Sequence, residues 1–242
     1  MLLQCHRHGP NSSQRMSQRP APADLLTRRL LIAGAAVPLL YFGVQLVAAP
    51  FYPGYSFLAR DASTLGSPGS RFPAIFNLGS IVTGVVTLVA TLGFYRAFRY
   101  LRIPPPLTWT TTFALVGSAI GSINAGVHPL PDPRHTSGIL WVLGMGLLLL
   151  PFLLPVALWQ VADLRSIRRY LVANLIVVAA LIPVMSGLVE RWIMMAGVEL
   201  PGLQSLLNNY QGMLQRIAAI VVFVPIGITA AALARRLTTP PN

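Results

Sequence analysis

The stretch that decides the fold is LLIAGAAVPLLYFGVQLVAA, residues 30–49. It carries no charged residue, and at 1.5 Å of rise per residue it forms a helix about 30 Å long, which matches the hydrocarbon core of a bilayer. Arg28 and Arg29 stand directly before it, and basic residues are retained on the cytoplasmic side. The stretch therefore predicts a transmembrane helix that begins in the cytoplasm.

Apolar blocks of this kind recur along the chain, separated by short polar stretches. We predict six transmembrane helices, at residues 30–49, 74–95, 107–127, 136–158, 170–190 and 213–233. Residues 1–24 are polar and have no hydrophobic period, so we expect a disordered cytoplasmic tail, in which Met16 is an alternative start to Met1. The expected fold is an all-α, polytopic integral membrane protein with one six-helix domain at residues 25–237.

Composition supports a membrane protein. The chain is 54% hydrophobic and 10% charged, whereas a soluble domain has about 25% charged residues. Its net charge of +12 raises the question of nucleic acid, but the arginines sit in small groups at the ends of apolar blocks and form no contiguous basic face. We therefore expect the bilayer and the anionic headgroups of its cytoplasmic face as partners, no nucleic acid, and a multi-pass location in the cell (plasma) membrane.

The distribution of arginine predicts the orientation. With both termini in the cytoplasm, thirteen of the eighteen basic residues fall on the inner side and five on the outer side, as the positive-inside rule requires. The inner set contains Arg7, Arg15, Arg19, Arg28, Arg29, Arg96, Arg99, Arg102, Arg165, Arg168, Arg169, Arg235 and Arg236.

Two compositional facts exclude kinds of chemistry. All eighteen basic residues are Arg, so no lysine Schiff base and no Walker lysine can form. Cys5 is the single cysteine, which excludes an intramolecular disulfide, a CxxC redox pair and a cysteine zinc site. We predict no cofactor, with zinc on His and Asp as the open alternative.

Polar residues inside the apolar blocks gather toward their outer ends. We predict that they surround a shallow, outward-facing cavity, because polar groups at membrane depth cost free energy unless they are paired or solvated. The ligand-binding residues expected there are Asn77, Asn124, His128, His135 and Glu190. The alternative interpretation is that helix ends are polar because they meet water.

The outer connection HPLPDPRH, residues 128–135, carries two imidazoles and a carboxylate. Together with Asp61 on a neighbouring outer connection, His128, Asp132 and His135 are ligand types that zinc accepts. The alternative is a rigid turn in which Asp and His cap helices. Serine hydrolysis with Ser56 or Ser137 beside these residues is a further option, but no GxSxG motif supports it.

Several short motifs carry a family resemblance. The stretch from Arg60 to Gly66, the segment Pro73-Ala-Ile-Phe-Asn77, Gly84, and His135 ahead of Gly138 resemble the bacterial membrane proteins grouped as domain of unknown function 998 (DUF998). The resemblance implies a six-helix membrane fold with a polar outer loop and no established activity. The chain departs from the family pattern in separating Asp61 from Leu65-Gly66. A looser likeness to eukaryotic autophagy-modulator membrane proteins implies a role in lipid or membrane homeostasis by analogy.

The expected function is that of a non-enzymatic membrane protein that binds or moves a small molecule or lipid through the outer polar cavity. One alternative is a metal-dependent hydrolase at the outer leaflet, with Asp61, His128, Asp132 and His135 holding the ion. Another is a membrane scaffold or accessory subunit.

Overall fold

The computed structural model describes residues 25–159, 161–185, 195 and 209–237, and in this part of the chain every regular element is helical. The predicted all-α class is confirmed. The predicted tail, residues 1–24, lies outside the described residues. The α-helices are α2 (Leu25–Ala48), α3 (Pro73–Tyr100), α4 (Pro105–Val127), α5 (Gly138–Gly144), α6 (Leu150–Ala157), α7 (Arg165–Met185) and α10 (Gln211–Arg236). Short 3₁₀ helices connect them: η1 (Ala49–Phe51), η2 (Ala62–Gly66), η3 (Pro133–His135), η4 (Met145–Leu149) and η5 (Ala162–Leu164).

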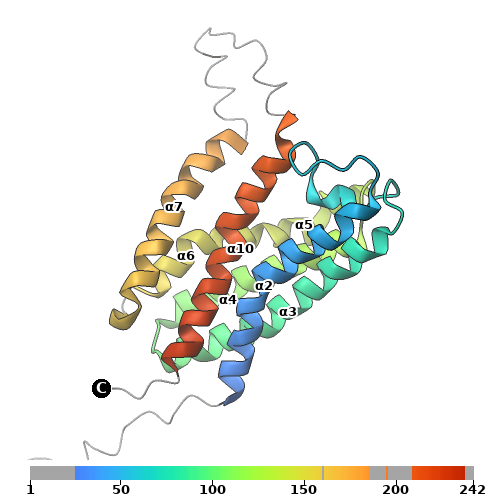
Figure 1. Ribbon diagram of the computed structural model, residues 1–242. Coiled ribbons are helices and arrows are strands. Elements are labelled where there is room, and N and C mark those ends of the chain that lie inside the picture. The colour runs from blue at the N-terminus through green and yellow to red at the C-terminus, as the bar shows by residue number, and fades with distance from the viewer. Residues whose placement is uncertain (1–24, 160, 186–194, 196–208, 238–242) are drawn as a thin grey trace, which may run out of the picture.

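The helices form an up-and-down bundle of six passes, in which α5, η4 and α6 together make the fourth pass (Figure 1). Helix α3 packs between α2 and α4, and α10 packs along α2. The start of α2 and the end of α10 lie at the same end of the bundle (Figure 1). The six-helix arrangement predicted from the apolar blocks is confirmed.

Four of the passes are long and apolar enough to cross a membrane by themselves: α2 with η1, α3, the fourth pass, and α10. Helix α4 is rich in threonine, and these hydroxyls bond to backbone carbonyls. Those of Thr110 and Thr112 donate to the carbonyls four residues earlier, each at 2.7 Å, so they present little unsatisfied polarity. Helix α7 is less apolar because Arg165, Arg168 and Arg169 lie in its first turns.

The helices extend beyond the predicted spans. Helix α3 continues to Tyr100, α10 covers 211–236, and α7 begins at Arg165, not at residue 170. An estimate based on hydrocarbon thickness marks the apolar part of a helix, whereas the hydrogen-bonded backbone continues into the headgroup region. The predicted end of the fifth helix, near residue 190, lies outside the described residues.

The prediction of one continuous fourth helix over 136–158 is wrong. The pass begins at Gly138 and is interrupted by η4, which ends two residues before Pro151. Proline has no N–H to donate to the carbonyl four residues earlier, and its ring collides with that carbonyl. The backbone between Gly144 and Pro151 therefore tightens into a 3₁₀ turn.

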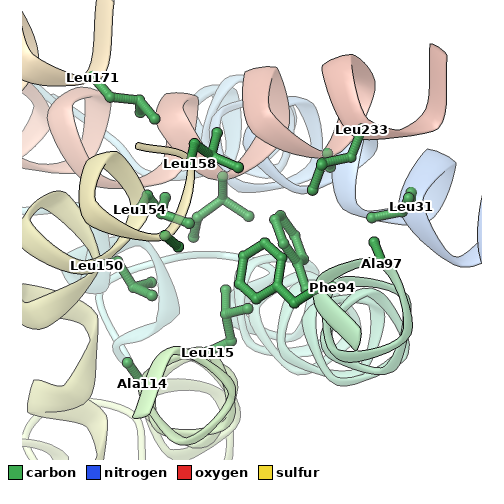
Figure 2. Close-up of a cluster of buried hydrophobic side chains, with 14 of the residues drawn as sticks. Leu31, Phe94, Ala97, Ala114, Leu115, Leu150, Leu154, Leu158, Leu171 and Leu233 are labelled. Atoms are coloured by element: carbon green, nitrogen blue, oxygen red, sulfur yellow. The ribbon is translucent and has the colours of Figure 1, made fainter. Parts of the chain in front are cut away.

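The core fills the centre of the bundle with aliphatic and aromatic side chains from all six passes (Figure 2). Phe94 and Phe98 of α3 are fully buried and pack in a T-shaped pair with centroids 5.9 Å apart. Around them lie Leu31, Leu115, Leu150, Leu154, Leu158 and Leu233. The fourth pass approaches α4 closely, because a Cβ added at Gly121 would lie 3.0 Å from Gly144 Cα. Gly121 of α4 and Gly144 of the fourth pass thus serve close packing.

One end of the bundle, which we call the inner end, collects the groups of arginines that the orientation count assigned to the cytoplasm. Arg96 Nε donates to Thr27 Oγ1 at 2.9 Å, which ties the end of α3 to the start of α2. Arg236 pairs with Asp163 at 2.9 Å, which ties the end of α10 to η5. The opposite, outer end carries Arg60, Arg71, Arg134 and Arg216. Among the described residues, the structure therefore separates the two arginine sets along the bundle axis.

Candidate ligand cavity at the outer end

A cavity of about 290 Å³ lies in the outer half of the bundle. It is bounded by side chains from α2, α3, α4, the fourth pass, α10 and the short helix η2. Its polar lining consists of Ser63, Ser80, Ser118, Ser122, Asn124, His135, Thr136 and Gln215. Its apolar lining includes Tyr41, Phe76, Trp141 and Phe223. Among the described residues none of those lining the cavity is Asp, Glu or Arg, so the cavity combines uncharged polar groups with apolar surface.

The connection between α2 and α3 covers one side of the cavity and is fastened to the start of α10. The Arg216 guanidinium donates to the carbonyls of Phe57 at 2.8 Å and Arg60 at 3.0 Å, and to the Tyr55 hydroxyl. It also lies over the Phe57 ring, 4.8 Å from its centroid. Burial raises the pKa of the Tyr55 hydroxyl, so that hydroxyl stays protonated and donates to the Asp61 carbonyl at 3.0 Å.

Two glutamines of α10 complete this fastening. Gln215 Oε1 accepts from the Ala62 backbone N–H at 2.7 Å, and Gln211 Nε2 donates to Asp61 Oδ2 at 2.9 Å. Burial raises the pKa of Asp61, although the Gln211 hydrogen bond and Arg216 act in the opposite direction. Asp61 therefore serves this contact, with its second oxygen buried and without a protein partner in the described structure.

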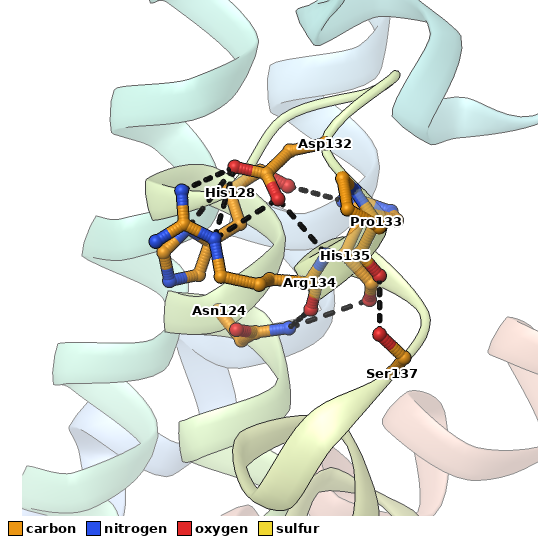
Figure 3. A network of polar contacts seen from close by, with 7 residues as sticks. All are labelled: Asn124, His128, Asp132, Pro133, Arg134, His135 and Ser137. Carbon is orange, nitrogen blue, oxygen red and sulfur yellow. Dashed lines mark hydrogen bonds and ion pairs between the residues drawn. The ribbon is translucent and has the colours of Figure 1, made fainter.

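The connection between α4 and α5 covers the other side and is rigid by its own hydrogen bonds (Figure 3). Asp132 caps η3, accepting from the Arg134 backbone N–H at 2.9 Å and from the Arg134 guanidinium at 2.7 Å. The hydrogen bonds and charge of Arg134 hold the pKa of Asp132 well below its usual range. His128 Nδ1 lies 3.5 Å from the same carboxylate. This geometry is the capped turn that the sequence suggested as the alternative to a metal site.

His135 joins the two connections. Its Nδ1 lies 2.7 Å from the His128 carbonyl oxygen, and its Nε2 lies 2.9 Å from Ser63 Oγ in η2. Asn124, at the end of α4, donates from Nδ2 to the carbonyls of Arg134 at 3.0 Å and His135 at 3.3 Å. The imidazole is therefore held from the backbone on one side and faces a serine hydroxyl on the other.

Two polar oxygens in the wall of the cavity have no protein partner in the described structure. They are Ser118 Oγ and Asn124 Oδ1, and their side chains are 2% and 3% exposed. Buried polar atoms are almost always hydrogen-bonded, because an unsatisfied one costs about 1–3 kcal/mol. These two oxygens thus mark positions where a bound molecule would supply the missing hydrogen bonds.

The five predicted ligand-binding residues are placed differently by the structure. Asn124 and His135 line the cavity. Asn77 donates to the Gly66 carbonyl at 3.1 Å, and His128 lies against Asp132, so both fix the outer connections. Glu190 lies outside the described residues.

The predicted metal ligands are engaged elsewhere. Asp132 is bonded to Arg134 and Asp61 to Gln211. In the part of the chain that the structure describes, no group of three His, Cys, Asp or Glu side chains lies close enough together to hold a metal ion. The zinc site stays a prediction that metal analysis would test.

Sequence reasoning missed Ser63 and Ser118 as members of the site. Ser63 and His135 are 72 positions apart, and serine occurs throughout the chain, so no motif links them. The serines proposed as nucleophiles have other contacts: Ser137 Oγ donates to the Pro133 carbonyl at 2.6 Å, and Ser56 Oγ accepts from the Ala59 N–H at 3.3 Å.

Comparison with known proteins gives the family. The family model described as "Protein of unknown function (DUF998)" matches residues 35–232, a range that extends from α2 to α10. No curated protein and no solved structure matches the chain. Because the matched range includes all six passes and both connections around the cavity, we conclude that this membrane protein belongs to the DUF998 family.

Proposed function

We propose that this protein is a multi-pass protein of the cell (plasma) membrane that binds a small, uncharged, hydrogen-bonding molecule in the outer cavity. The observation that carries the proposal is the pair of buried oxygens, Ser118 Oγ and Asn124 Oδ1, which belong to side chains that line this cavity and have no protein partner in the described structure. A ligand with hydroxyl or amide N–H groups would satisfy both.

The size and chemistry of the cavity narrow the ligand. Its volume of about 290 Å³ lies at the lower edge of the range for small-molecule sites, about 300–1,000 Å³. The uncharged lining disfavours anions and cations, since a buried unpaired charge is costly. Tyr41, Trp141 and Phe223 offer apolar surface beside the hydroxyls. These features suit a polyol, either as a free molecule or as the headgroup of a neutral lipid.

A second contact with lipid is proposed at the inner end. Arg28, Arg29, Arg99, Arg165 and Arg169 are exposed there. Arginines near the membrane surface attract anionic headgroups, at about 1 kcal/mol each. We therefore propose that the inner end faces the anionic cytoplasmic leaflet, which would orient the cavity outward.

We do not propose the metal-dependent hydrolase, because two of its four ligands, Asp61 and Asp132, already bind Gln211 and Arg134. A scaffold role has no observation in its favour, whereas the cavity and its unpartnered oxygens favour a ligand.

Ligand binding can be measured through Trp141, which lines the cavity. Purified protein in nanodiscs is titrated with glycerol in one arm and with a monoacylglycerol in the other while tryptophan fluorescence is recorded. We expect a saturable change that is absent in Trp141→Phe. Saturation by glycerol alone identifies a free polyol as the ligand, and saturation by only the monoacylglycerol identifies a lipid.

A matched pair of variants on α4 controls the titration. Ser118→Leu fills the cavity and should raise Kd at least tenfold, which corresponds to about 1.4 kcal/mol. Thr110→Leu adds a similar side chain at an exposed position of the same helix and should leave Kd unchanged. An unaltered Kd in Ser118→Leu, or no saturable signal in either arm, would mean that the cavity holds only water.

A further inference from the structure

We propose that Ser63 is a nucleophile activated by His135, and that the cavity is an acyl-transfer site for carboxylic esters. This inference rests on the proposed function, since it identifies the ligand as an ester of a small polyol. It introduces a serine and a reaction that neither the family description nor the sequence motifs contain.

The first step of the argument is the proton on His135. The His128 carbonyl oxygen, 2.7 Å from Nδ1, can only accept a hydrogen bond. Nδ1 therefore carries the proton of the neutral imidazole, and Nε2 is an acceptor. The Ser63 hydroxyl, 2.9 Å from Nε2, then donates to it. This is the hydrogen bond that a serine nucleophile makes with its general base.

The second step is the positioning of the base. In the triad arrangement a third group orients the imidazole through Nδ1, and here the third group is the His128 carbonyl. That carbonyl is held at the end of α4, where the His128 N–H donates to the Asn124 carbonyl at 2.9 Å. The Asn124 side chain binds the backbone on both sides of the Arg134–His135 peptide. Asn124 is thus a positioning residue for the imidazole.

The third step is the donor for a developing oxyanion. Gln215 Oε1 accepts from the N–H of Ala62, the residue before Ser63. This contact fixes the orientation of the amide and leaves its NH₂ group as the donor. Gln215 lines the same cavity as Ser63 and His135. We assign its NH₂ group to the carbonyl oxygen of the bound ester, where such a donor stabilises the tetrahedral intermediate.

The reaction proceeds without a further reagent. Ser63 Oγ attacks the ester carbonyl carbon while its proton passes to His135 Nε2, and a bond forms between Oγ and the acyl carbon. The tetrahedral intermediate collapses, the bond between the acyl carbon and the alcohol oxygen breaks, and Nε2–H returns the proton to the departing alcohol. Water, or a second alcohol, then attacks the acyl carbon while its proton passes to His135 Nε2. The bond between Ser63 Oγ and the acyl carbon breaks, Nε2–H returns the proton to Oγ, and a carboxylic acid or a new ester leaves.

The test uses a fluorophosphonate probe, which forms a stable bond only with activated serines. Full-length protein in nanodiscs is incubated with the probe, and the labelled peptide is identified by mass spectrometry. We expect labelling of wild-type protein at Ser63. Mapping the label on wild-type protein requires no variant to fold.

Variants then separate catalysis from a merely structural contact. Ser63→Ala should abolish labelling, and His135→Ala should slow labelling of the remaining Ser63 by about 10²–10⁴-fold, the usual contribution of a general base. Ser137→Ala, which removes a hydroxyl bonded to the Pro133 carbonyl beside His135, should label at the wild-type rate. The rate of monoacylglycerol hydrolysis should likewise be abolished in Ser63→Ala, reduced in His135→Ala and unchanged in Ser137→Ala.

The result that overturns the inference is wild-type protein that carries no label, or a label on another residue. If the Trp141 titration still shows binding in that case, the cavity is a binding site and the proposed function stands. If neither binding nor labelling is seen, both proposals fail.

Discussion

At the scale of residues, the outer end owes its order to polar side chains that bind backbone. Arg216, Gln215 and Asn124 each bond to carbonyl or N–H groups of a connection whose regular structure is limited to short 3₁₀ helices. A backbone group that leaves water must find a partner. These side chains therefore let two irregular segments lie against the cavity.

Asp61 gives a prediction about pH. Its pKa is raised in the folded protein, chiefly by burial, so between its ordinary pKa and the raised value the folded state binds more protons than the unfolded state. Stability then falls as pH rises through this window. We expect Asp61→Asn to melt at a higher temperature than wild type at neutral pH, and the difference to shrink as pH is lowered toward about 4.

Asp132 is the control for this experiment, because Arg134 lowers its pKa. A lowered pKa contributes stability above the unfolded value, which is lost on acidification. Asp132→Asn should therefore melt at a lower temperature than wild type at neutral pH, with a difference that also shrinks in acid. If Asp61→Asn, like Asp132→Asn, melted at a lower temperature than wild type at neutral pH, the prediction would be contradicted.

The candidate site was predicted in part from the sequence. Asn124 and His135 could be found because a polar side chain near the end of an apolar block is costly and thus conspicuous. Ser63 could not be found, because its importance comes from a contact with a residue 72 positions away.

At the scale of elements, the interface between α4 and the fourth pass depends on glycine. A Cβ at Gly121 would lie 3.0 Å from Gly144 Cα, a backbone atom that cannot rotate away. We expect Gly121→Ala to lower the free energy of unfolding by about 1–3 kcal/mol, as overpacking does. Melting temperature and denaturation in SDS measure the effect.

Gly43→Ala in α2 is the matched control, because an added Cβ there meets nothing within 4 Å. Alanine is favoured over glycine in a helix by about 1 kcal/mol, so this variant should be as stable as wild type or more so. If both variants lowered the free energy of unfolding equally, the close approach at Gly121 would not be what determines the effect.

The helices themselves were predictable because an apolar block of bilayer length leaves little choice of structure. The ends of the helices were not predictable, since hydrophobicity does not indicate polar helical turns beyond the apolar block, such as Arg96 to Tyr100. The break at η4 shows a further limit. Pro151 was visible in the sequence, but Pro38, Pro155 and Pro225 lie inside α-helices that continue, so proline alone does not locate a 3₁₀ turn.

At the scale of the whole molecule, the separation of arginines predicts the orientation in the membrane. In a variant with Cys5 replaced by serine, single cysteines are introduced as Arg71→Cys at the outer end and Arg99→Cys at the inner end, both exposed positions. A membrane-impermeant maleimide added to intact cells should label Arg71→Cys and leave Arg99→Cys unlabelled until the cells are lysed.

Labelling of Arg99→Cys but not of Arg71→Cys in intact cells would mean that the orientation is the reverse and that the cavity faces the cytoplasm. Labelling of both cysteines in intact cells would contradict the bundle itself, because α3 separates these positions by its full length.

The fastening of the first outer connection to α10 also bears on biogenesis. Residues 57–62 find their partners on Gly212, Met213, Gln215 and Arg216, which leave the ribosome some 150 residues later. Until the last helix is inserted, that connection lacks its contacts with α10, and the cavity lacks the part of its wall that Gln215 and Phe223 supply. A nascent chain truncated before α10 would lack these contacts, so the complete cavity forms only after the last helix has been synthesised.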